Sequence, residues 1–180
     1  MSEFTCMYYE KAMPAAFCDY VINSVDWSAA QSGDVLKEEG RDYTNFRKVK
    51  IVSDDLMSPM GSVCKNYLVD ANSKGKWAEA ICNFDIVQIL KYETDDHYWW
   101  HNDLLPPVNG MRRRVSLVMM LSDPSEFQGG EFQIKDKTDN ALKNKGDIIV
   151  FDSATRHRVA PVTGGTRITA VCWAYEFYKE

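Results

Sequence analysis

The chain has 180 residues, of which 45% are hydrophobic and 26% charged, a balance typical of one folded globular domain. Its 26 acidic and 21 basic residues give a formal net charge of −5, which argues against nucleic acid as a partner. The longest uncharged apolar run, residues 115–121, is too short to span a membrane, and the first residues lack the pattern of a signal peptide. We therefore expect a cytoplasmic protein in which residues 1–180 form a single domain.

The five cysteines are odd in number, widely spaced and never arranged as C-x-x-C. This pattern indicates neither a disulfide framework nor a thiolate zinc site. We expect reduced thiols, most of them buried.

Two amphipathic helices are predicted within about residues 1–80. The first begins near Pro14, and its apolar residues follow the spacing of one helix face: Phe17, Tyr20, Val21 and Val25. The second begins with a Ser58 cap followed by Pro59 and ends at residues 72–75. Its predicted core face consists of Met60, Val63, Cys64, Tyr67, Leu68 and Ala71.

From about residue 81 the apolar pattern takes the period of a strand, with turn signals between the segments. The predicted strands are residues 86–92, 114–121, 131–134, 147–151, 158–162 and 167–177. Their spacing favours an antiparallel sandwich or barrel over about residues 81–180. Because the helices come first and the strands afterwards, we expect an α+β fold with helices packed on one side of a sheet.

Three residues within this region have the types and spacing of metal ligands. His101 and Asp103 are two apart, so on a strand both side chains point to one face. This pair alone is weak, because it could simply be hydrogen-bonded. With His157 it forms the two-histidine, one-carboxylate set of non-haem Fe(II) oxygenases. His97 lies four residues before His101, but the acidic residues 95 and 96 beside it indicate an exposed turn and not a ligand.

A cationic residue, Arg167, follows the third candidate ligand by ten residues. We expect a strand that His157 opens to turn near Gly164 into a return strand that Arg167 begins, which places these two residues roughly 13 Å apart along the sheet. A five-carbon dicarboxylate bound to a metal at one end and to Arg167 at the other spans about this distance. A zinc hydrolase could use the same three ligands, but it would need an acid/base residue and would not explain the arginine.

At these positions the sequence resembles the Fe(II)/2-oxoglutarate-dependent dioxygenases, and among them the prolyl 4-hydroxylase-like (PKHD-type) group. The resemblance covers residues 92–177. The pattern Y-x5-Y-x2-H-x-D is met by Tyr92, Tyr98, His101 and Asp103, and H-x9-(K/R)-x5-W by His157, Arg167 and Trp173. A further strand pattern is met by Arg113, Ser116 and Leu121. The chain departs from the family at residues 95–97, where Gly-Gly is frequent, and at Met120, where the family has Tyr.

The resemblance implies a double-stranded β-helix (jelly-roll) barrel with N-terminal supporting helices. It also implies site roles: Fe(II) ligands His101, Asp103 and His157; 2-oxoglutarate contacts Arg167 and Tyr92; and substrate contacts Tyr98, Arg113 and Trp173. The last three could equally be barrel-lining residues. Ascorbate is a possible reductant for such an enzyme.

The implied activity is hydroxylation of an unactivated C–H bond by O2 and 2-oxoglutarate, with release of succinate and CO2. A prolyl residue in a peptide or protein is the expected substrate. Two alternatives stay open: the same chemistry on a free amino acid or other small molecule, and a non-catalytic metal-binding barrel. Asp103 argues against halogenation, and Trp173 stands where nucleic-acid demethylases have a second arginine.

Two segments beside the motifs have more than one interpretation. Trp99 and Trp100 are expected to differ in role, since neighbouring strand residues face opposite ways. The stretch 106–110 is either a mobile flap over the site or an ordinary loop, and the basic run 112–114 is either a solvated patch or part of the site.

Overall fold

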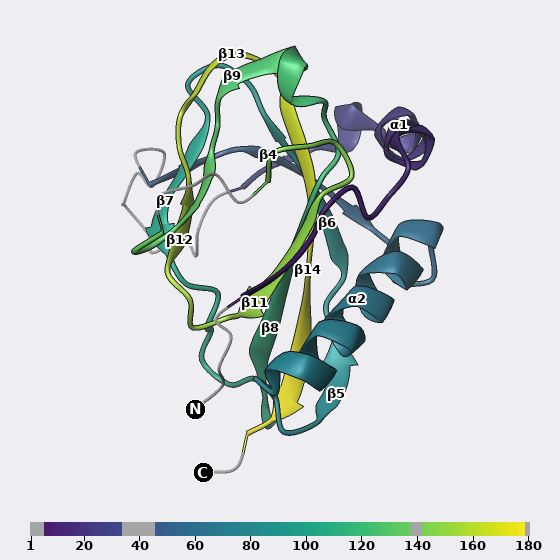
Figure 1. The fold of residues 1–180 in the computed structure, drawn as a ribbon, viewed down its shortest axis with the longest axis vertical. Coiled ribbons are helices and arrows are strands. Elements are labelled where there is room, and N and C mark those ends of the chain that lie inside the picture. Colours follow the sequence, from purple (N-terminus) through teal and green to yellow (C-terminus); the bar gives the residue numbers. More distant parts are fainter. Residues whose placement is uncertain (1–5, 34–45, 138–141, 179–180) are drawn as a thin grey trace.

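A computed structural model describes residues 6–33, 46–137 and 142–178 of the chain (Figure 1). The helices are α1 (Ala15–Ser24) and α2 (Pro59–Gly75), with 3-10 turns η1 (Trp27–Ala29) and η2 (Pro124–Glu126). The strands are β1 (Cys6–Tyr9), β2 (Gln31–Ser32), β3 (Arg47–Lys48), β4 (Lys50–Asp54), β5 (Ile81–Phe84), β6 (Val87–Tyr92), β7 (His97–His101), β8 (Met111–Met120), β9 (Phe127–Gly129), β10 (Phe132–Ile134), β11 (Ile148–Asp152), β12 (His157–Val159), β13 (Val162–Gly165) and β14 (Arg167–Phe177). Within these three segments, no helix has the length and apolarity of a membrane span.

The strands form a jelly roll of antiparallel sheets, as expected. The large sheet has the order β1-β11-β8-β14-β6-β4-β2, with β5 also paired to β14, and a four-stranded sheet has the order β10-β12-β7-β3. Figure 1 shows the four-stranded sheet facing the large one, while α2 lies on the other face of the large sheet. A further two-stranded sheet consists of β13 and β9, which lie at the top of the view in Figure 1.

Both predicted helices are confirmed. Ser58 caps α2 because its hydroxyl accepts a hydrogen bond from the Gly61 amide at 3.0 Å. Helix α1 begins after Pro14, which occupies the cap position. The predicted core face of α1 is partly wrong, because its buried residues are Cys18 and Val21 and Tyr20 is 57% exposed.

The large sheet is buried on both faces, which explains the nearly continuous apolar character of its central strands. Alternate residues of β14 point to the helices, namely Ile168, Ala170, Cys172 and Ala174. The residues between them point to the barrel interior, namely Arg167, Thr169, Val171 and Trp173. The alternation of side chains along β14 thus places one set of residues in the core and the other set in the cavity.

The predicted order of elements, helices before strands, is wrong. Strand β1 precedes α1, and β2, β3 and β4 lie between the helices. These strands are short and peripheral: β1 pairs with the outer side of β11, and β4 pairs with β6. Their hydrophobic pattern is weak because burial on such strands is incomplete.

The predicted hairpin between residues 157 and 167 is also wrong. Strand β12 belongs to the four-stranded sheet and β14 to the large sheet, while β13 between them pairs with β9. His157 and Arg167 therefore approach the interior from opposite sheets. The estimate of their separation along one hairpin does not apply.

All five cysteines are free, as expected. Cys18, Cys64 and Cys172 are buried in the core between the helices and the large sheet, whereas Cys6 and Cys82 are partly exposed.

Candidate active site

The three predicted metal ligands come together in the barrel interior. The nearest ligand atoms of His101, Asp103 and His157 all lie within 4.8 Å of one another. Each imidazole Nε2 is 3.7 Å from a different carboxylate oxygen of Asp103. His101 ends β7 and His157 begins β12, and these two residues are paired across the strands. The three side chains could occupy one face of a divalent metal ion and leave its other coordination positions open.

Backbone carbonyls orient both imidazoles. His101 Nδ1 lies 2.6 Å from the Trp99 carbonyl oxygen, and His157 Nδ1 lies 2.9 Å from that of Thr155. A proton on Nδ1 donates to each carbonyl, so the Nε2 lone pair is free to bind a metal. Burial lowers the pKa of His101 to about 3, which keeps this imidazole neutral at neutral pH.

Asp103 is held as a carboxylate. Burial raises its pKa, but His157 and His101 act in the opposite direction, as do hydrogen bonds from Trp173 and Ser116, so the net shift is downward. Asp103 lies beyond the end of β7 and not on the strand itself, and its amide donates to the Ser153 carbonyl at 2.9 Å.

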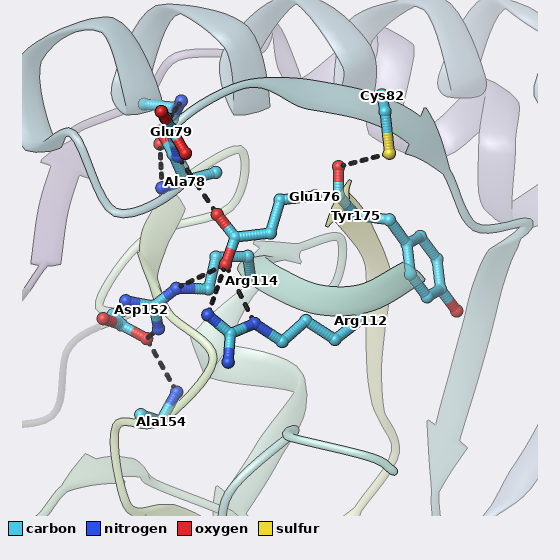
Figure 2. Close-up of polar contacts among 10 residues, drawn as sticks. Ala78, Glu79, Cys82, Arg112, Arg114, Asp152, Ala154, Tyr175 and Glu176 are labelled. Carbon is cyan, nitrogen blue, oxygen red and sulfur yellow. Dashed lines mark hydrogen bonds and ion pairs between the residues drawn. The ribbon is translucent and has the colours of Figure 1, made fainter. Parts of the chain in front are cut away.

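A turn over residues 152–155 supports two of the three ligands, since Ser153 and Thr155 supply the carbonyls just described. The Asp152 carboxylate accepts from the Ala154 amide at 2.9 Å and from Arg114 Nη1 at 2.6 Å. Figure 2 shows that Arg114 also reaches Glu176, which in turn binds Arg112. Glu176 is buried while Arg112, Arg114 and Asp152 are partly exposed, so the turn is anchored to a half-buried ionic network.

Arg167 is the most unusual residue of the interior. Its side chain is fully buried, and all three guanidinium nitrogens lack a hydrogen-bond partner among the described residues. Burial lowers the pKa of Arg167 to about 10, so it stays cationic at neutral pH. Its guanidinium carbon lies 5.3 Å from the Tyr92 ring centroid. An unpartnered buried cation is costly, so this residue favours an anionic ligand.

One cavity is lined by Arg167 and by all three residues of the metal-ligand cluster. Tyr92, Tyr98 and Trp173 line it, as their predicted roles require. Burial raises the pKa of Tyr92 above its usual value and that of Tyr98 to about 12, so both phenols stay neutral. The remaining wall is largely aliphatic and aromatic, which suits a site that excludes water.

A bulge in β7 decides which of its residues face the cavity. Two steps along β12, from His157 to Val159, match three steps along β7, from His101 to Tyr98. Tyr98 therefore stacks on His101, with ring centroids 3.4 Å apart.

The residues between and beside this pair do not line the cavity. The guanidinium carbon of Arg158 lies 5.1 Å from the Trp99 ring centroid and 4.9 Å from that of Trp100, and the different roles of the two residues stay a prediction. His97 lies outside the metal-ligand cluster, as expected, and its Nδ1 is 3.1 Å from the Asp95 carbonyl.

Arg113 does not line the cavity. Its guanidinium pairs with Asp85 at 2.5 Å, contacts the Tyr175 hydroxyl at 3.3 Å and lies 4.0 Å from the Trp173 ring centroid. Its guanidinium packs on the Trp173 ring, and its contact with substrate stays a prediction. In the stretch 106–110, Val108 is bridged to Met111 and is 63% exposed.

Sequence reasoning missed Arg47, which enters the cavity wall from β3. No motif marks this residue. It reaches the site because β3 pairs with β7, where Arg47 lies opposite Tyr98.

Comparison with known families matches residues 87–175 to the profile of the 2OG-Fe(II) oxygenase superfamily. The match contains all three candidate metal ligands and Arg167. The chain belongs to the 2OG-Fe(II) oxygenase superfamily. A PKHD-type hydroxylase of Idiomarina loihiensis is 35% identical over 97 residues, which cover 52% of this chain and 44% of that protein. One of Janthinobacterium is 36% identical over 90 residues, or 46% and 40% of the two chains. The chain thus spans less than half the length of these relatives.

Solved structures of prolyl hydroxylases share the fold. A viral collagen prolyl hydroxylase of Paramecium bursaria Chlorella virus-1 superposes with a TM-score of 0.72 at 21% identity, covering 97% of each chain. A prolyl-4-hydroxylase of Pseudomonas putida gives 0.71 at 18% identity, covering 99% of this chain and 95% of its own. A Trichoplax adhaerens prolyl hydroxylase, solved with a peptide fragment, gives 0.73 at 15% identity, covering 96% and 84%.

The residues present fit the metal and cosubstrate of the superfamily. Two imidazoles and one carboxylate suit Fe(II) and leave the other coordination positions open. Arg167 offers an unpaired guanidinium to a carboxylate. Space for this side chain depends on Gly130, where an added Cβ would lie 2.9 Å from Arg167 Cδ. At the departure from the family, Met120 is buried opposite Thr169 on β14.

Proposed function

We propose that this chain uses Fe(II), O2 and 2-oxoglutarate to hydroxylate an unactivated C–H bond of a prolyl residue in a peptide or protein. The observation that carries the proposal is the unpartnered, fully buried guanidinium of Arg167 in the same cavity as a two-histidine, one-carboxylate cluster. A dicarboxylate that chelates a metal satisfies both features at once, because its distal carboxylate can pair with Arg167.

The side chains of the site then have distinct tasks. His101, Asp103 and His157 would hold Fe(II) through atoms that their hydrogen bonds already point inward. Arg167 binds the distal carboxylate of 2-oxoglutarate, and Tyr92 borders the same molecule. When bound, Fe(II) would supply the oxidation chemistry: one oxygen atom of O2 enters the hydroxylated product, the other enters succinate, and CO2 is released.

The prolyl substrate rests on the relatives and on the cavity wall. The solved neighbours named above are prolyl hydroxylases. In this chain Tyr98 and Trp173 present aromatic surface to the cavity, and a pyrrolidine ring packs well against such surface. Orientation by these walls would limit oxidation to a substrate that is already in place.

The test is succinate release by the purified protein with Fe(II), 2-oxoglutarate and O2, in the presence of a panel of proline-containing peptides. A stimulating peptide should gain one oxygen atom in mass. His157→Ala and Asp103→Ala should abolish both signals, while their far-UV circular dichroism stays near that of the wild type. His97→Ala is the matched control, because it removes the histidine that lies outside the cluster.

The same assay separates the alternatives. Mass gain with free amino acids or other small molecules, but with no peptide, would replace the prolyl substrate and keep the chemistry. Metal binding without succinate release for any substrate would favour the non-catalytic barrel. Succinate release at the wild-type rate by His157→Ala would contradict the metal assignment itself.

A further inference from the structure

The cavity wall contains a second arginine, which is half-buried and has no ion pair with another described residue. Arg47 lines the same cavity as Arg167, and its Nε is buried without a hydrogen bond. Among residues 6–33, 46–137 and 142–178, no carboxylate forms an ion pair with Arg47, although its neighbour Lys48 pairs with Asp96 at 3.0 Å. Neither the metal ligands nor the 2-oxoglutarate site described above uses this cation.

Stacking fixes where Arg47 lies relative to the metal ligands. Its guanidinium carbon is 4.5 Å from the Tyr98 ring centroid, and the His101 ring stacks on Tyr98 at 3.4 Å with a 13° interplanar angle. An imidazole at that spacing covers one face of the phenol, so the guanidinium lies over the other face. Arg47 is therefore one ring further from the metal site than His101, and it borders the part of the cavity beyond Tyr98.

The contact with Tyr98 leaves the donors of Arg47 available. A cation–π contact uses none of the N–H bonds in a hydrogen bond, and the Nε of Arg47 has no hydrogen-bond partner among the described residues. The planar fork of a guanidinium matches the two oxygens of a carboxylate.

Charge balance shows that the cosubstrate does not need Arg47. With Fe(II) and 2-oxoglutarate bound, the cosubstrate and Asp103 carry three negative charges, which Fe(II) and Arg167 neutralise. Both imidazole ligands are neutral in a metal complex. Arg47 is half-buried at the wall of this largely apolar cavity, so its positive charge remains available to a further anion.

We propose that Arg47 binds a carboxylate of the substrate and so selects substrates that carry one close to the oxidised carbon. This inference rests on the proposed function, because it takes Arg167 and the metal as the sites of 2-oxoglutarate. The carboxylate has two possible sources: the terminal carboxylate of a free amino acid or of the last residue of a peptide, and an aspartate or glutamate side chain beside the target residue.

The experiment measures anaerobic binding to protein loaded with Mn(II) and 2-oxoglutarate, by calorimetry, with probes in matched pairs. One pair is L-proline and L-prolinamide. A second pair is acetyl-Gly-Pro with a free carboxylate or a carboxamide. A third pair is a capped tetrapeptide with Glu or Gln after the proline. The first two pairs report a terminal carboxylate, and the third reports a side chain.

We expect the wild type to bind at least one carboxylate probe with an affinity about tenfold or more above that for the uncharged amide of the same pair. Arg47→Gln should lose this preference, Arg47→Lys should keep part of it, and Arg47→Glu should reverse it. Lys48→Gln is the matched control: it removes a positive charge from the same strand but outside this cavity, and should keep the preference.

A second titration separates this proposal from the proposed function. Arg47→Gln should bind 2-oxoglutarate within about threefold of the wild type, which also shows that the cavity is folded. If no carboxylate probe binds better than the amide of its pair, or if Arg47→Gln keeps the preference, the proposal is wrong. A loss of 2-oxoglutarate affinity in Arg47→Gln, as large as that in Arg167→Ala, would instead make Arg47 a cosubstrate residue and overturn the proposal.

Discussion

The buried guanidinium of Arg167 has no hydrogen-bond partner in the described part of the chain, so its contribution should appear in ligand binding. Loss of one member of a buried, charge-assisted pair costs about 2–5 kcal/mol, which predicts that Arg167→Ala weakens 2-oxoglutarate binding roughly 30-fold to several thousand-fold. Arg167→Lys should keep part of the affinity, because the charge remains while the two-pronged geometry is lost. Calorimetric titration of the Mn(II)-loaded, anaerobic protein measures this. An affinity of Arg167→Ala within about threefold of the wild type would place the distal carboxylate elsewhere.

Gly130 offers a second test of the same pocket. Its φ is +67°, and an added Cβ would lie 2.9 Å from Arg167 Cδ. Gly130→Ala should therefore displace Arg167 and weaken 2-oxoglutarate binding, while Mn(II) binding is kept. Gly110→Ala is the matched control, because Gly110 has a similar φ of +70° but no atom within 4 Å of the added Cβ. Both variants carry a similar backbone strain of about 1–2 kcal/mol. Equal cosubstrate affinities in the two variants would contradict the predicted displacement.

Among the elements, the turn between β11 and β12 should control metal affinity. Asp152 fixes this turn through Arg114, and the turn supplies the carbonyls that hold Asp103 and His157. Mutation of a residue that orients metal ligands without binding the metal typically lowers metal affinity by about 10–100-fold, so Asp152→Asn should weaken Mn(II) binding within that range. Electron paramagnetic resonance of free Mn(II) gives the affinity directly. Arg112→Gln is the control, since Arg112 contacts Glu176 but not Asp152 (Figure 2). Wild-type affinity in Asp152→Asn would show that the turn is rigid without its carboxylate.

In the molecule as a whole, Asp147 joins the N-terminal strand to the barrel. Its carboxylate accepts hydrogen bonds from the Tyr8 hydroxyl and from the amides of Lys11, Lys143 and Asn144. Burial raises the pKa of Asp147, but these hydrogen bonds outweigh burial and leave the pKa below its usual value. The unfolded chain therefore binds the proton at a higher pH than the folded chain does.

This shift makes folding sensitive to acid. The stabilisation from Asp147 is complete above the unfolded-state pKa of about 4 and is lost as the pH falls through the lower pKa of the folded state. Asp147→Asn should lower the free energy of unfolding at pH 7 and reduce its decrease between about pH 5 and 3. Urea unfolding at a series of pH values measures both. A parallel pH dependence in the variant and the wild type would exclude Asp147 as a source of acid sensitivity.

The local features of this protein could be read from its residues. Ser58 and Pro59 predicted the start of α2, and the period of two in residues 167–177 predicted both a strand and an inward-facing Arg167. The metal ligands followed from residue type and spacing together with the family resemblance, and the structure brings them together. The helix start and the strand are confirmed, because capping and strand alternation depend on neighbours in the chain. Metal binding by the three candidate ligands stays a prediction.

Other features depend on which distant strands pair. The bulge in β7 sets Tyr98 beside His101, against simple alternation, because β12 matches two residues to three. Pairing of β3 with β7 brings Arg47 to the cavity, and the separate sheets of β12 and β14 replace the expected hairpin. Such pairings depend on the burial and hydrogen bonding of the whole barrel. They cannot be predicted from any short stretch of residues. The candidate metal ligands could therefore be predicted from the chain, whereas the cavity that would select a substrate arises only when the sheets close around it.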